Sequence, residues 1–186
     1  MIKVVIAYHS GYGHTKKLAE AVHAGAAGVI GTSPKLLGVD AIDEAGWRDL
    51  AAADAIVFGA PTYMGGASAP FKVFADASVK PWFTQAWKDK VAGGFTCSLG
   101  MSGDKYATLM SFVTLAMQHG MIWVGTGTPG AQHAGAPEEI NRLGAWIGVM
   151  AQADNAPPEQ TPPSGDIASA RAYGRRIAEI TKALRK

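Results

Sequence analysis

Short apolar runs alternate with amphipathic stretches along the chain. The first run, Ile2 to Tyr8 (IKVVIAY), lacks strict alternation and is rich in Val and Ile, which is typical of a strand buried on both faces of a parallel sheet. Thr15 to Ala27 follows, with its apolar residues on one stripe and its charged residues elsewhere, which predicts a helix. A strand followed directly by a helix is the unit from which parallel sheets are built.

Four further apolar runs predict the rest of the sheet. The short piece Lys35 to Val39 and the run Ala55 to Ala60 come first, and Val91 to Ser98 and Met121 to Gly125 follow. Each run is short and has turn-forming residues nearby, as is usual for strands.

Capping residues mark three further helices. One is predicted from Ser68, with a proline in its first turn, to about Ala77, and another from Asp104 to about His119, where a glycine ends it. The last begins near Asp166 and runs to the C-terminus. Strand and helix therefore alternate about five times, which predicts an α/β fold with a parallel sheet covered by helices on both faces.

Residues 126–164 interrupt this alternation. They contain six of the ten prolines and little helical period except from Glu138 to Ala145. An excursion of this length is either a functional loop or an oligomer contact.

Composition supports a globular protein of one domain, residues 1–186, since 48% of the residues are hydrophobic and 17% are charged. The formal net charge is +2, but the last 22 residues hold six basic and two acidic side chains, which leaves the first 164 residues at −2. A terminal helix with a solvated basic face explains this tail, and no aromatic-interleaved basic stripe indicates a nucleic-acid partner.

Cysteine and histidine usage argues against disulfides and metals. Cys97 is the only cysteine, and the five histidines have no ligand spacing. The apolar N-terminal run is too short for a signal peptide, and no run approaches the length of a membrane span. We therefore expect a cytoplasmic protein with no metal and no membrane insertion, and a structural role for Cys97.

The loop after the first strand, Ser10 to Thr15 (SGYGHT), has the chemistry of a phosphate site. Unpaired N–H groups at a helix N-terminus attract anions, glycines let the backbone curl around them, and two hydroxyls can add hydrogen bonds. The loop lacks the lysine of a nucleoside-triphosphate loop, and Lys16 breaks the G-x-G-x-x-G pattern. One terminal phosphate fits it better, and a plain capped turn is the alternative.

Two more loops follow the third and fourth strands. Gly59 to Ser68 contains Tyr63 and Met64 between glycines, and Ser98 to Asp104 is small and flexible. Because the carboxyl ends of parallel strands meet at one edge of the sheet, ligands bind where these loops converge. Together the loops predict a phosphate at one end of a site and a flat heteroaromatic ring at the other.

These three loops resemble those of the flavodoxin-like FMN proteins. The segments S-G-Y-G-H-T, G-A-P-T-Y-M-G-G and F-T-C-S-L-G-M-S-G-D carry the resemblance, which extends to L-A-M-Q-H-G-M at 115–121 and to the final helix. The likeness is greatest to the WrbA-type NAD(P)H:quinone oxidoreductases. It implies a three-layer sandwich with strand order 2-1-3-4-5 and FMN as the cofactor.

The resemblance also implies roles for individual residues. Tyr12, His119 and Trp82 would act in catalysis, with Trp82 lining the quinone site, Tyr12 near the nicotinamide and His119 reaching the flavin. The cofactor would be held by Ser10, Gly11, Tyr12, Gly13, His14, Thr15, Pro61, Thr62, Tyr63, Met64, Gly65, Ser98, Leu99, Gly100, Met101, Ser102, Gly103, Asp104 and His119.

The implied activity is transfer of two electrons, as hydride, from NAD(P)H to a quinone or similar flat acceptor. The dense apolar residues of the helix after Asp104 exceed one stripe and add a homodimer or homotetramer as an expectation. Two alternatives stay open. One is a flavodoxin that carries single electrons, which the net charge of +2 fits poorly. The other is a non-enzymatic FMN-binding regulatory module.

Overall fold

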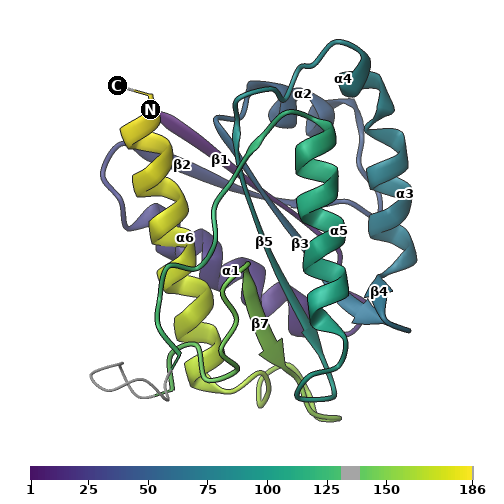
Figure 1. The fold of residues 1–186 in the computed structure, drawn as a ribbon, viewed down its shortest axis with the longest axis vertical. Helices are drawn as coiled ribbons and strands as arrows, with labels where there is room; N and C mark the ends of the chain where they lie inside the picture. The colour runs from purple at the N-terminus through teal and green to yellow at the C-terminus, as the bar shows by residue number, and fades with distance from the viewer. Residues whose placement is uncertain (131–138, 186) are drawn as a thin grey trace.

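A twisted parallel sheet forms the centre of the molecule (Figure 1). The computed structural model describes residues 1–130 and 139–185. The main strands have the order β2-β1-β3-β5-β6, all parallel, which confirms the expected flavodoxin-like order. Their bounds are β1 Ile2–Tyr8, β2 Thr32–Gly38, β3 Ala55–Tyr63, β5 Val91–Ser98 and β6 Ile122–Trp123.

Helices cover both faces of this sheet (Figure 1). Two of them, α1 (His14–Ala27) and α6 (Ser164–Leu184), pack on one face. On the other face lie α2 (Glu44–Ala52), α3 (Ala69–Ala77) and α5 (Lys105–Gln118), with the short α4 (Val79–Phe83) after α3.

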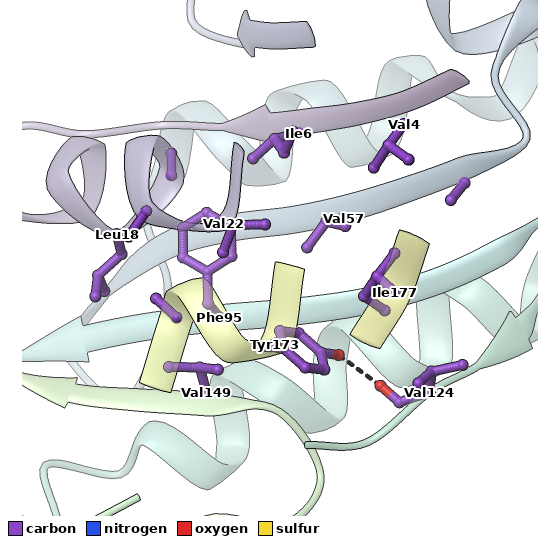
Figure 2. Packing of buried hydrophobic residues seen from close by; sticks show 14 of the residues in the cluster. Val4, Ile6, Leu18, Val22, Val57, Phe95, Val124, Val149, Tyr173 and Ile177 are labelled. Atoms are coloured by element: carbon purple, nitrogen blue, oxygen red, sulfur yellow. Dashed lines mark hydrogen bonds between the residues drawn. The ribbon is translucent and has the colours of Figure 1, made fainter. Parts of the chain in front are cut away.

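The continuous apolar strands divide their side chains between two cores. In β1, Val4 and Ile6 face the α1 and α6 side, whereas Val5 and Ala7 face the other side. This is the period of two that strand geometry imposes. Figure 2 shows the first core, in which the Tyr173 hydroxyl donates to the carbonyl oxygen of Val124.

The two helices on this face touch backbone to backbone. A Cβ atom placed on Gly25 of α1 would lie 1.9 Å from the carbonyl oxygen of Arg171, and one on Gly174 of α6 would lie 1.9 Å from that of Val22. Only glycine permits this approach. The contact fixes α6 beside the helix that begins at the predicted phosphate loop.

The fifth strand position differs from the prediction. The single strand expected from Met121 to Gly125 is only the two residues of β6, and the chain after Trp123 is irregular, with a φ of 63° at Gly127. The chain returns as β7 (Val149–Gln152), which pairs in parallel with the other end of β5. A two-residue strand, β4 (Gly66–Ala67), pairs antiparallel with β3.

Three features of the helices also differ from what the sequence analysis predicted. The helix α2 was not predicted, although Asp43 caps it by accepting the N–H of Gly46 at 2.8 Å. Residues 139–143 of the expected helix from Glu138 are turns, because Glu139 and Asn141 have φ values of 67° and 50°, and residues 144 and 145 are irregular. Glu138 itself lies outside the described residues. Asp104 precedes α5 in a left-handed conformation and gives it no side-chain cap.

The returning segment is anchored by a buried ion pair. Arg142 donates to both carboxylate oxygens of Asp166, at 2.8 and 3.0 Å, and Asp166 also accepts the N–H of Gln152 at 2.8 Å. These bonds join the excursion, β7 and the start of α6. Within the described part of the chain, no helix is long and apolar enough to cross a membrane.

Candidate functional site

A cavity of about 770 Å³ opens at the carboxyl edge of the sheet, where the loops after β1, β3, β5 and β7 meet. This is the edge at which open α/β sheets bind their ligands, and the volume is in the range of small-molecule sites. The cavity is lined by Tyr12, His14, Thr15, Pro61, Thr62, Tyr63, Met64, Cys97, Ser98, Leu99 and residues 153–158.

The loop before α1 supplies hydrogen-bond donors to one end of the cavity. Gly13 stands at the helix N-cap in a left-handed conformation. The hydroxyl oxygen of Ser10 accepts the N–H groups of Gly13 and Lys16, both at 3.1 Å. The N–H groups of His14 and Thr15 belong to the first helical turn, which has no intrahelical acceptor for them. They and the positive end of the helix dipole suit an anion.

His14 joins this loop to the wall that follows β7. Its Nε2 lies 2.8 Å from the carbonyl oxygen of Ala156, and since a carbonyl only accepts, Nε2 carries the proton. The sequence placed His14 beside the phosphate. The structure adds that its ring holds the wall of residues 153–158 against the first loop.

The floor of the cavity is a buried thiol. Cys97 is 3% exposed, and its Sγ lies 3.2 Å from the hydroxyl oxygen of Thr15. Burial raises the pKa of the thiol to about 11, although the hydrogen bond from Thr15 and the charge of Lys105 oppose the shift. Cys97 is therefore a neutral thiol at physiological pH, and the Thr15 hydroxyl is directed to it rather than to the cavity mouth.

Two tyrosines stand at the mouth. The rings of Tyr12 and Tyr63 are 6.3 Å apart and meet edge to face at 67°. Burial raises the pKa of Tyr63, and the neighbouring Tyr12 and Cys97 add to the increase, so the phenol stays protonated. Met64 beside it is fully exposed. The mouth thus presents apolar surface to solvent.

A chain of buried hydroxyls supports the loop after β3. Thr62 Oγ1 lies 2.8 Å from Thr96 Oγ1 on β5 and 2.8 Å from Thr108 Oγ1 on α5. A hydroxyl has one proton and two acceptor lone pairs, so Thr62 donates to at most one of these partners and accepts from at least one. This network fixes Thr62, which lines the cavity, against two other elements.

The loop after β5 divides between two cavities. Ser98 and Leu99 line the main cavity. Met101, Ser102 and Asp104 instead line a neighbouring cavity of about 540 Å³ with Arg142. Of the residues expected to embrace a flavin from this loop, the structure therefore brings only the first two to the main cavity.

His119 and Trp82 do not line this cavity, so the expected roles of His119 in the flavin pocket and of Trp82 in the quinone site stay predictions. The helix α5 begins at the carboxyl edge of the sheet and runs back along it, so its last turn is at the opposite edge (Figure 1). His119 is buried there, with Nε2 2.9 Å from Ser78 Oγ and its ring 4.2 Å from that of Trp87. Trp82 lies in α4 at the same end.

The environment of His119 is that of a neutral core histidine. Ser78 donates its one hydroxyl proton to the carbonyl of Ala75 at 2.7 Å, so His119 Nε2 donates to Ser78. Nδ1 then has no partner among the described residues. Burial lowers the pKa of His119, which keeps the ring uncharged.

Sequence reasoning missed the wall of residues 153–158 and the lysine behind Ser98. The wall follows β7, and its proline pair hides any strand or helix period. Lys105 is fully buried and donates from Nζ to Ser98 Oγ at 2.8 Å and to the Gly100 carbonyl at 2.6 Å. No sequence signal distinguishes it from an exposed lysine.

The fold and this site define a flavodoxin-like α/β protein with a ligand site at the carboxyl edge of its sheet. A crystal structure described as a flavodoxin, WrbA-like protein from Agrobacterium tumefaciens superimposes with a TM-score of 0.78, at 43% identity over 98% of this chain and 99% of that one. Flavodoxin FldP of Pseudomonas aeruginosa is 44% identical over 99% of both chains.

More distant relatives have enzyme names. An NAD(P)H dehydrogenase (quinone) of Geobacter sulfurreducens is 31% identical over 98% of this chain and 99% of its own length. The family model for NADPH-dependent FMN reductases matches residues 39–136. The chain belongs to this family of flavodoxin-like proteins, and its cofactor is FMN.

The described residues fit FMN. The first turn of α1 offers the N–H groups of His14 and Thr15 and a positive dipole to a phosphate, while the N–H of Lys16 is already bonded to the Ser10 hydroxyl. The tyrosines, Met64 and Leu99 offer apolar surface to a flat ring at the other end of the cavity. The thiol of Cys97 and the hydroxyls of Thr62 and Ser98 are neutral groups that need no counter-ion from a ligand.

Proposed function

We propose that the chain is an FMN-dependent oxidoreductase that takes a hydride from NAD(P)H and passes two electrons to a quinone or another flat acceptor. The observation that carries this proposal is the wide mouth of the cavity, lined by the exposed apolar side chains of Tyr12, Met64 and Leu99. A second flat molecule can lie there against a bound flavin. The quinone dehydrogenase names of several relatives support the same activity.

In this proposal FMN supplies the hydride and electron chemistry, and the chain supplies position and electrostatics. The N–H groups of His14 and Thr15, in the loop from Ser10 to Thr15, would hold the phosphate. The loop Pro61 to Gly65, with Ser98 and Leu99, flanks the ring, and the wall of residues 153–158 excludes water from one side. Tyr12 orients the nicotinamide or the acceptor at the mouth.

The test is steady-state oxidation of NADH and NADPH by FMN-loaded protein with benzoquinone as acceptor. We expect one quinone reduced for each NAD(P)H oxidised. Tyr12→Ala should lower kcat/KM, whereas Tyr106→Ala should not, because Tyr106 has similar exposure, 61% against 76%, and lines the neighbouring cavity instead. Absence of NADH and NADPH oxidation in loaded wild-type protein would refute the proposal.

A single-electron carrier is the second candidate, because FldP, at 44% identity, is named a flavodoxin. Stepwise anaerobic reduction of the loaded protein separates the two functions. A carrier would accumulate a stable one-electron-reduced form and show no turnover with benzoquinone. The proposed enzyme would pass directly to the two-electron-reduced form.

A further inference from the structure

Lys105 is a buried cation beside the cavity wall. It has no exposed surface, although lysine ammonium groups are strongly hydrated and are almost never fully buried unless paired. Its Nζ donates to Ser98 Oγ and to the Gly100 carbonyl. Over residues 1–130 and 139–185, it forms no ion pair with a carboxylate. The folded chain therefore solvates this charge with dipoles and gives it no counter-ion.

A single residue, Ser98, lies between the ammonium group of Lys105 and the main cavity. Ser98, its hydrogen-bond partner, lines the cavity, and so does Cys97, whose buried thiol lies near enough to interact electrostatically with Lys105. Burial lowers the pKa of Lys105, and the other charged groups that act on it, Asp166 and Arg142, pair with each other. Because the carboxylate of Asp166 is paired with Arg142, it does not serve as a separate counter-ion for Lys105.

We propose that Lys105 is a positioning residue whose charge stabilises the reduced cofactor more than the oxidised cofactor and so raises the reduction potential of bound FMN. The inference rests on the proposed function, because it needs FMN in the cavity. A hydride equivalent, which is two electrons and one proton, adds one negative charge to the ring system. A cation in a poorly solvated wall attracts that added charge far more strongly than one in water would.

A purely structural role for Lys105 has a different consequence. If its two hydrogen bonds only hold the loop after β5 in place, their loss weakens the binding of oxidised FMN and of reduced FMN by the same factor. The reduction potential, which depends on the ratio of the two dissociation constants, would then stay unchanged. The potential therefore distinguishes charge from scaffolding.

The experiment measures the two-electron potential of FMN bound to wild-type protein, Lys105→Met and Lys105→Gln. Met removes the charge and both donors, while Gln removes the charge and keeps a donor for the loop. Lys90→Met is the matched control, because Lys90 is also buried and donates to two carbonyls, those of Ala51 and Ala53, but at the other edge of the sheet.

We expect both Lys105 variants to lower the affinity for reduced FMN, relative to that for oxidised FMN, by about ten-fold. This change lowers the reduction potential by ~30 mV for a two-electron couple. Lys90→Met should leave it unchanged. If Lys105→Met does not fold, Lys105→Gln decides the question. An unchanged potential in the folded Lys105 variants, or an equal drop in Lys90→Met, would overturn the inference. If wild-type protein does not bind FMN, the proposed function itself fails, which is a separate result.

Discussion

Gly13 offers a quantitative test of how the cavity is built. It has a φ of 92°, and a Cβ atom there would lie 2.9 Å from Pro158 Cγ and 3.2 Å from Pro158 Cβ. Gly13→Ala therefore meets two costs. The left-handed backbone costs a non-glycine residue about 1–2 kcal/mol, and the contact with the proline adds roughly 1–3 kcal/mol of overpacking. We expect a loss of about 2–5 kcal/mol in the free energy of unfolding.

Gly65→Ala separates the two costs. Gly65 has a similar φ of 80°, but a Cβ atom there meets nothing within 4 Å. Equilibrium urea unfolding without cofactor should show a loss of only about 1–2 kcal/mol. Pro158→Ala should return part of the loss when combined with Gly13→Ala, since neighbouring residues couple. Equal losses in the two glycine variants, with no coupling to Pro158, would refute the close contact between the first loop and the wall.

Three further predictions follow from single side chains. Tyr173→Phe should cost about 1–3 kcal/mol of unfolding free energy, because it leaves a buried carbonyl and a buried N–H unpaired; Tyr106→Phe, which changes an exposed phenol, should cost almost nothing. Cys97 should react with a thiol reagent at pH 8 roughly 100-fold more slowly than a thiol of pKa 9, because its pKa is about 11; reaction at the rate of a free thiol would contradict this. Trp82→Ala should leave the affinity for FMN unchanged in a titration, since Trp82 lies in α4, away from the cavity; weaker binding would show that Trp82 reaches a flavin.

The same thiol makes stability depend on alkaline pH. Its pKa is about 11 in the folded chain against 9.0 for the ordinary group, so its contribution is complete below pH 9 and disappears as pH rises through 11. At roughly 1.4 kcal/mol for each pKa unit, it amounts to ~3 kcal/mol. Cys97→Ala should remove this part of the slope.

Local patterns in the sequence predicted the elements that position the site. The strand Val91–Ser98 was predicted with the same bounds as in the structure, because a short run of small and apolar residues between turn residues is typical of a buried strand. The loop after β1 was also predicted from a local pattern, since glycines and hydroxyl residues directly before a helix are typical of an anion-binding loop. The strand order came from the family resemblance, and the handedness of crossovers predicted a parallel sheet with helices on both faces.

Long-range pairing explains what could not be predicted. The strand β7 is only four residues long and is stabilised by its partner β5, which periodicity cannot reveal. The wall after it was therefore read only as part of an excursion. His119 was placed by resemblance in the flavin pocket, but the direction of α5 carries it to the other edge within one chain.

The ionisation of the cavity wall bears on which redox function the site supports. The buried groups that line it, Cys97 and Thr62, are neutral, and Tyr63 at the mouth keeps its proton. Asp154 is the carboxylate among the lining residues, and it is exposed, where solvent and salt screen its charge. Behind Ser98, Lys105 contributes a positive charge that forms no ion pair with a carboxylate in the described part of the chain. In the proposed function, a wall with this charge distribution would stabilise the negative charge of a reduced flavin, which would favour hydride uptake over the low potential that a single-electron donor requires.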